Sequence, residues 1–125
     1  MQEILPNKDN KAILVSHMSS RIIEKLYIIT KDFTYIISKK ENSSVVKRVD
    51  TINFLEDNEY INKLLKKKGL LIGHTYTCFI GDDIALIAKM SHRKYAPFIA
   101  GRLLRFYRQI KNRKQSKKIH EIAQI

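Results

Sequence analysis

Acidic residues are nearly absent from the last third of this 125-residue sequence. From residue 89 onward the single acid is Glu121, whereas eleven residues in the same stretch are lysine or arginine. Residues 1–88 are nearly balanced, with thirteen basic and eleven acidic residues. Almost the whole net charge of +12 therefore lies in the last third. We expect a polyanionic partner, because bound phosphates would relieve the self-repulsion and release their counterions.

Cysteine is scarce as well. Cys78 is the single cysteine, which excludes an intramolecular disulfide and a cysteine-rich zinc site. The four histidines are dispersed without ligand spacing, and glycine-rich phosphate loops are absent, so no metal, cofactor or small-molecule substrate is expected. No apolar run approaches the ~20 residues that span a bilayer. The first residues also lack a basic start before an apolar stretch, and we expect a soluble protein without a membrane partner.

One domain with polar ends suits this length. We predict an N-terminal extension at residues 1–20, a single α+β domain at 21–112 and a basic C-terminal tail at 113–125. Two segments rich in Ile, Tyr and Thr, residues 26–30 and 33–38, are typical of strands and form either a hairpin or one bent strand. Residues 39–44 have the composition of a loop. Residues 74–80 and 84–90, separated by Gly81, Asp82 and Asp83, predict a second hairpin.

Two helices are expected, one between the two strand pairs and one after the second pair. Asp50 or Asn53 can cap a helix at about 53–67, and Gly69 can take the left-handed conformation after it. A second helix should hold Pro97 in its first turn, where proline is tolerated. Its apolar residues fall on one arc, and Arg105, Arg108 and Lys111 lie on the opposite arc. This order predicts a small antiparallel sheet with two helices packed on one face.

Two short motifs, in this order, resemble a known family. Residues 50–54 (Asp-Thr-Ile-Asn-Phe) open the first helix, and residues 91–95 (Ser-His-Arg-Lys-Tyr) lead into the basic helix. The pattern resembles the eukaryotic large-subunit (60S) ribosomal protein twenty-two family over about residues 33–112. Arg93 and Lys94 match its Lys-Arg pair, and four further positions match its aromatic and leucine residues: Tyr95, Phe98, Ile99 and Leu104. Arg102 and Arg105 match two of its basic residues.

The chain departs from that pattern at four places. Pro97 and Gly101 stand where the family prefers lysine, and the first helix is expected to be a few residues longer. The tryptophan after the basic helix is missing, and the closing strand has no obvious counterpart. Residues 118–125 are left as either a shortened strand or a tail.

The resemblance implies a structural constituent of the large ribosomal subunit in the cytoplasm, bound to ribosomal RNA and neighbouring ribosomal proteins, and not an enzyme. Ten basic residues are predicted to bind RNA: Arg93, Lys94, Arg102, Arg105, Arg108, Lys111, Arg113, Lys114, Lys117 and Lys118. Guanidinium groups can pair with phosphate through two hydrogen bonds, so the arginines are the expected positioning contacts. The lysines at 66–68 are either a further phosphate contact or the capped end of a helix.

Two other functions remain open from the residues. One is a DNA-binding accessory or regulatory protein, although no helix-turn-helix or zinc finger is evident. The other is a small metal-dependent nuclease built around Asp82, Asp83 and neighbouring lysines, against which adjacent acids after a glycine are typical turn formers. Tyr27, Tyr35 and Tyr76 are candidates for base stacking on a sheet face, with half-buried packing as the commoner use.

Overall fold

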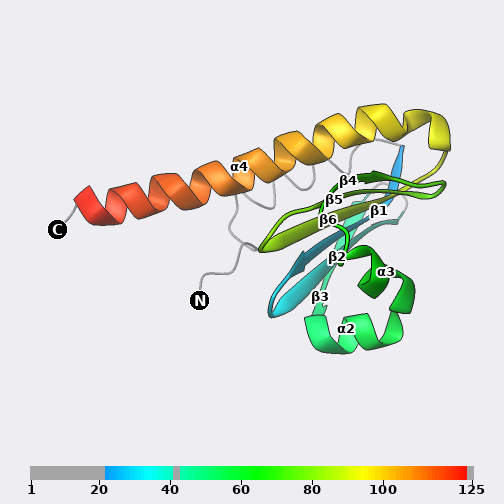
Figure 1. Cartoon of the computed structure of the whole chain (residues 1–125), viewed down its shortest axis with the longest axis horizontal. Coiled ribbons are helices and arrows are strands. Elements are labelled where there is room, and N and C mark those ends of the chain that lie inside the picture. Colours follow the sequence, from blue (N-terminus) through cyan, green and yellow to red (C-terminus); the bar gives the residue numbers. More distant parts are fainter. Residues whose placement is uncertain (1–21, 41–42, 124–125) are drawn as a thin grey trace.

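A six-stranded sheet forms the centre of the molecule (Figure 1). The computed structural model describes the backbone of residues 22–40 and 43–123, and the side chains of residues 22–39 and 45–112. The predicted N-terminal extension, residues 1–20, lies outside this part. The strands are β1 (Ile23–Thr30), β2 (Phe33–Lys40), β3 (Ser43–Asp50), β4 (Gly69–Ile72), β5 (Tyr76–Ile80) and β6 (Ile84–Met90). They lie in the order β3-β2-β1-β6-β5-β4, and every neighbouring pair is antiparallel.

The hairpin predicted at residues 74–90 is confirmed, and of the two alternatives for residues 26–38 the hairpin is right. β1 and β2 pair across the turn at Lys31 and Asp32, so the alternative of one bent strand is wrong. β5 and β6 pair across the turn that begins at Gly81. The outermost strands, β3 and β4, were not predicted. The loop expected at 39–44 is wrong at both ends, because residues 39 and 40 end β2 and residues 43 and 44 begin β3.

The first helical segment is two short helices, α2 (Thr51–Asp57) and α3 (Glu59–Leu64), instead of one helix over 53–67. Asp50 is its N-cap, as one of the two predicted alternatives, and accepts hydrogen bonds from the backbone N–H groups of Ile52 and Asn53. The helix breaks at Asn58, whose side-chain amide donates to the carbonyl of Phe54 at 2.7 Å. Such a bond competes with helical pairing. Gly69 has a φ of +99°, in the left-handed region that was predicted.

A long helix closes the described chain. The short 3₁₀ helix η1 (Arg93–Tyr95) precedes α4 (Ala96–Ala123), and Pro97 lies in the first turn of α4, where proline is tolerated. Residues 113–123 of the predicted basic tail continue this helix, so the alternative of a shortened strand is wrong. Residues 111–123 contain no glycine or proline that would end it. Of the described helices, none is long and apolar enough to cross a membrane.

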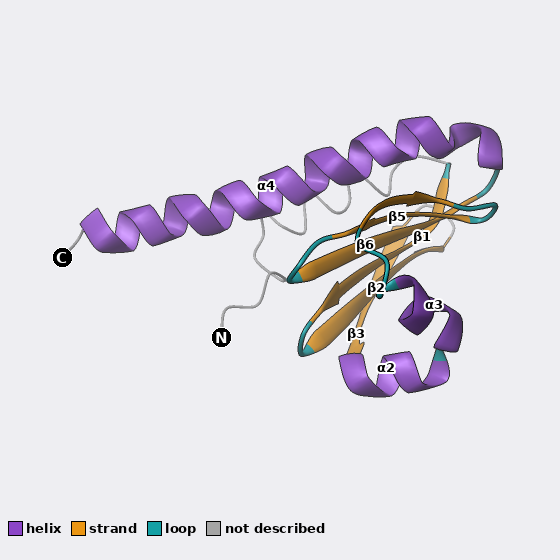
Figure 2. Cartoon of the chain, in the orientation of Figure 1, coloured by secondary structure: helices purple, strands orange, loops and turns teal. Residues whose placement is uncertain are grey.

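The α+β class is confirmed, but the predicted packing of both helices on one face is wrong. Figure 2 shows α4 across one face of the sheet and the α2–α3 pair below the opposite face. Two separate clusters of buried side chains agree with this arrangement. Ile28 and Leu86 belong to the cluster under α4, whereas Tyr27 and Ile87 belong to the cluster under α2 and α3. The central strands are therefore buried on both faces, which produces three layers.

Candidate nucleic-acid interface

The orientation of α4 is fixed by one apolar stripe that packs on the sheet. Its buried residues recur at helical spacing: Ile99, Leu103, Phe106 and Ile110. Arg105 and Arg108 lie on the opposite side of the helix and are exposed. Neither guanidinium has a hydrogen-bond or ion-pair partner among the described residues. The predicted separation of an apolar side and a cationic side is therefore confirmed for Arg105 and Arg108, whereas Lys111, predicted on the same side, is half-buried.

Arg102 lies at the edge between these two sides and is half-buried. Its Cζ lies 4.6 Å from the centroid of the Phe98 ring, a cation–π contact. Nη1 is shielded from solvent and has no hydrogen-bond partner among the groups that the structure describes. The ring therefore holds this guanidinium against α4, in contrast to the more exposed Arg105 and Arg108.

Arg93 and Lys94 are exposed on η1, just before α4. His92 caps this turn, because its Nδ1 accepts a hydrogen bond from the backbone N–H of Lys94 at 3.4 Å. The Lys94 ammonium lies 5.1 Å from the centroid of the Tyr95 ring. The structure thus places two more predicted cations at the start of the helix that carries the others.

Lys111, by contrast, is already paired. Its ammonium donates to Asp83 at 3.3 Å and lies 5.6 Å from the centroid of the Tyr107 ring. Asp83 raises the Lys111 pKa through this hydrogen bond and its charge. The contact ties α4 to the turn between β5 and β6, so part of this lysine's charge is compensated within the protein.

The remaining predicted cations lie on the last turns of α4: Arg113, Lys114, Lys117 and Lys118. Their side chains are outside the described part of the structure. By sequence, Lys114 and Lys117 take the helical positions that continue the apolar stripe after Ile110. Figure 1 shows this part of α4 extending past the sheet.

The acidic turn between β5 and β6 joins the layers. Asp82 accepts a hydrogen bond from Lys68, which follows α3, while Asp83 contacts Lys111 on α4. Lys68 lowers the pKa of Asp82 through this bond and its charge. Both acids line a hollow of about 400 Å³ that Thr30 and Leu65 also border. Each acid therefore pairs with a lysine on a different side of the sheet, which is a structural role.

Groups typical of metal or thiol chemistry are not assembled in the described residues. No three His, Cys, Asp or Glu side chains among them are placed to hold a metal ion. Cys78 is 1% exposed, and burial raises the pKa of its thiol to about 12. The thiol therefore stays protonated at neutral pH and packs in the core as a small apolar residue.

The three tyrosines considered for base stacking have different environments. Tyr27 and Tyr35 are buried in the two cores, which confirms the packing alternative for both. Tyr76 is half-buried, and its ring lies beside that of the exposed Tyr60. Sequence reasoning missed Tyr60, because its position depends on the break between α2 and α3.

No family model, curated protein or solved structure matches the chain.

Proposed function

We propose that this protein binds RNA through the outer side of α4, by phosphate neutralisation and shape rather than by reading a base sequence. The basic residues of η1 and α4 supply the contacts, with Arg93, Arg105 and Arg108 as positioning arginines. The protein then acts as an architectural component of a ribonucleoprotein. No covalent chemistry is assigned to it.

The observation that carries this proposal is the unpaired state of the outer arginines. α4 buries Phe106 and Ile110 while Arg105 and Arg108 remain exposed, without partners among the described residues. At about 42 Å, a helix of 28 residues is long enough to follow a phosphate backbone beyond the edge of its own sheet. Solvated cations are common on protein surfaces. Here, however, they lie along one helix that contains a single acid.

A narrower form of the proposal places the protein in the large ribosomal subunit, as the resemblance to the twenty-two family implies. The helix start at Asp50 and the segment that leads from Arg93 into α4 support it. The strand arrangement departs from the family pattern, because three strands precede α2 and three lie between α3 and α4. The general proposal of RNA binding does not depend on this narrower form.

Sedimentation of a cell lysate on a sucrose gradient, with the protein followed by mass spectrometry, tests both forms. We expect the protein to move with large ribosomal subunits at moderate salt and to move to the top of the gradient after ribonuclease treatment. The variant Arg105→Glu/Arg108→Glu should stay at the top without any treatment. The matched variant Lys31→Glu/Lys47→Glu changes the net charge equally at exposed positions away from α4 and should sediment as the wild type does.

Each form has its own contrary result. Ribonuclease-sensitive sedimentation away from ribosomal subunits would contradict the ribosomal form and leave RNA binding supported. Sensitivity to deoxyribonuclease instead of ribonuclease would favour the DNA-binding alternative. A wild-type protein at the top of every gradient would contradict RNA binding in the cell.

A further inference from the structure

Two lysines face each other on the sheet face opposite α4. Lys25 of β1 and Lys89 of β6 are cross-strand partners, and both are half-buried. They share the face of Tyr27 and Ile87, because side chains alternate along a strand. Like charges directly opposite each other destabilise a sheet. An anion bound between the two ammonium groups would remove that repulsion.

A pair of aromatic rings adjoins these lysines. Tyr76 of β5 is the next cross-strand partner of Lys89. The ring centroids of Tyr76 and Tyr60 lie 5.9 Å apart, with the planes inclined by 40°. Tyr60 is 59% exposed, so much of its ring is open to solvent. Exposed aromatic rings beside cations are the surfaces on which unpaired bases stack.

The register of the sheet places these residues in one row. Successive cross-strand partners from β3 to β5 are Val45, Ser38, Lys25, Lys89 and Tyr76. At the usual strand spacing the row spans about 19 Å. The buried core under α2 and α3 is formed by the adjacent rows that contain Tyr27 and Ile29. The row itself is not fully buried and lies at one end of the sheet.

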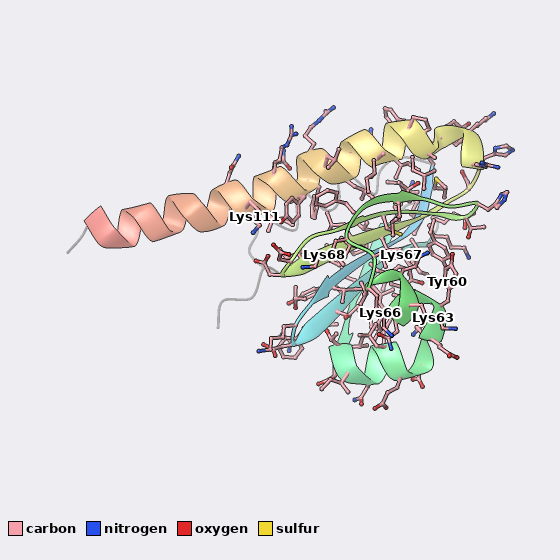
Figure 3. The ribbon with its side chains drawn as sticks, in the orientation of Figure 1. Tyr60, Lys63, Lys66, Lys67, Lys68 and Lys111 are labelled. Carbon is pink, nitrogen blue, oxygen red and sulfur yellow. The ribbon has the colours of Figure 1, made fainter. Side chains whose placement is uncertain are left out.

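This end of the sheet also leads into η1. The backbone N–H of Ser91 donates to the carbonyl of Ile22 at 2.9 Å, next to the start of β1. Arg93 and Lys94 follow within three residues and are exposed. Figure 3 shows Tyr60 at the end of the domain away from Lys111. Basic groups therefore continue from the sheet face around this end to α4.

We propose that Lys25, Lys89, Tyr60 and Tyr76, here called the tyrosine–lysine surface, bind an unpaired nucleic-acid strand. The two lysines hold phosphate groups, and bases stack on the Tyr60 ring. Glu24, 4.0 Å from Lys89, and Glu59, 3.7 Å from Lys63, border this area. The Lys63–Glu59 pair is largely exposed and the Lys89–Glu24 pair is about half exposed; such surface pairs are worth little and can exchange for phosphate. This surface is separate from the outer side of α4 and extends binding to a second face of the sheet.

The chain contains no tryptophan, so Tyr60→Trp introduces a single fluorescent reporter. We expect its emission to be quenched by a single-stranded RNA oligonucleotide, because a base stacks on the indole. An RNA duplex and heparin, a polyanion without bases, should leave the emission nearly unchanged. Equal quenching by heparin, or none at a saturating concentration of the single strand, would overturn the proposal.

Affinity measurements assign the contacts. Tyr60→Ala should raise the Kd for the single strand about tenfold, the loss typical of one stacked base. Lys25→Gln/Lys89→Gln should raise this Kd while leaving the fold intact. Ile52→Ala is the matched control, since Ile52 is an exposed side chain of the same helical layer. An unchanged Kd in both tyrosine–lysine variants would contradict the proposal.

A combined variant distinguishes failure of the proposal for the tyrosine–lysine surface from failure of the proposal for the outer side of α4. When Arg105→Glu/Arg108→Glu is combined with Tyr60→Trp, quenching of the tryptophan fluorescence at saturation should persist while duplex binding weakens. If quenching disappears although circular dichroism shows an intact fold, the tyrosine–lysine surface is not an independent site. If duplex binding is unaffected but quenching is seen, the proposed role of α4 is wrong and the present inference stands.

Discussion

At the scale of single residues, adjacent positions on α4 have opposite environments. Arg105 is exposed, whereas the next residue, Phe106, is 3% exposed and belongs to the core under the helix. A helix advances about 100° per residue, so one step moves a side chain from solvent toward the sheet. Function and stability are therefore separable between neighbouring residues.

Substitution of these two neighbours tests that separation. Arg105→Glu should weaken RNA binding without lowering the free energy of unfolding by more than about 0.5 kcal/mol, as is usual for surface positions. Phe106→Asp should cost at least about 4 kcal/mol, because it leaves a cavity and buries a charge. Urea denaturation and RNA titration measure the two effects. Gln109→Asp, exposed on the same helix, controls for the poor helix propensity of aspartate. Equal destabilisation by all three would mean that the faces of α4 are misassigned.

At the scale of elements, α4 is held to the sheet partly by Tyr107. Its ring centroid lies 4.7 Å from that of Phe79 on β5. The ring also covers Gly81, where a Cβ atom would come within 2.8 Å of the tyrosine oxygen. The β5–β6 turn therefore needs glycine for this close approach. Gly101, which lies on α4 itself, has no atom within 4 Å of the place where a Cβ atom would stand.

These two glycines should respond to alanine in opposite directions. Gly81→Ala should lower the free energy of unfolding by about 1–3 kcal/mol, because it displaces Tyr107 from Phe79. Gly101→Ala should raise it by about 0.5–1 kcal/mol, because alanine is the better residue inside an exposed helix. Thermal or urea unfolding of both variants measures the pair. A neutral Gly81→Ala would mean that Tyr107 does not hold α4 to the turn.

The sequence carries a sign of the double-sided sheet that was missed, and it marks the two edge strands only weakly. Residues 84–88 of β6 are all buried, and a continuous apolar run is the expected sign of a strand covered on both faces. This apolar run indicates helices on both sides of the sheet, although we predicted both on one side. β3 was harder to recognise, because an edge strand with exposed Val45, Val46 and charged neighbours resembles a loop. β4 has only four residues and pairs on one side.

The candidate site, like the fold, could be predicted from the sequence only in part. Helical spacing was enough to separate Arg105 and Arg108 from the buried stripe, because both features repeat locally. The ion pair of Lys111 with Asp83 and the opposition of Lys25 to Lys89 depend on sheet order and register. Those are long-range properties that no local pattern contains.

At the scale of the whole molecule, charge and packing are divided between the layers. The acids at the β5–β6 turn compensate Lys68 and Lys111, one on each side of the sheet. The cations at Arg105 and Arg108 have no such compensation among the described residues. Arg105 and Arg108 thus present uncompensated charge on one helix, where a phosphate backbone can release counterions on binding.

The most direct test of the central claim is the salt dependence of binding to a fluorescein-labelled RNA hairpin, measured by fluorescence anisotropy. The slope of log K against log salt counts the phosphate contacts, at about 0.7–0.9 per contact. We expect Arg105→Gln/Arg108→Gln to reduce the magnitude of this slope by about 1.5. Lys31→Gln/Lys47→Gln removes the same charge from exposed positions elsewhere and should leave the slope unchanged. Equal slopes for the two variants would show that net charge, and not the outer side of α4, holds the RNA.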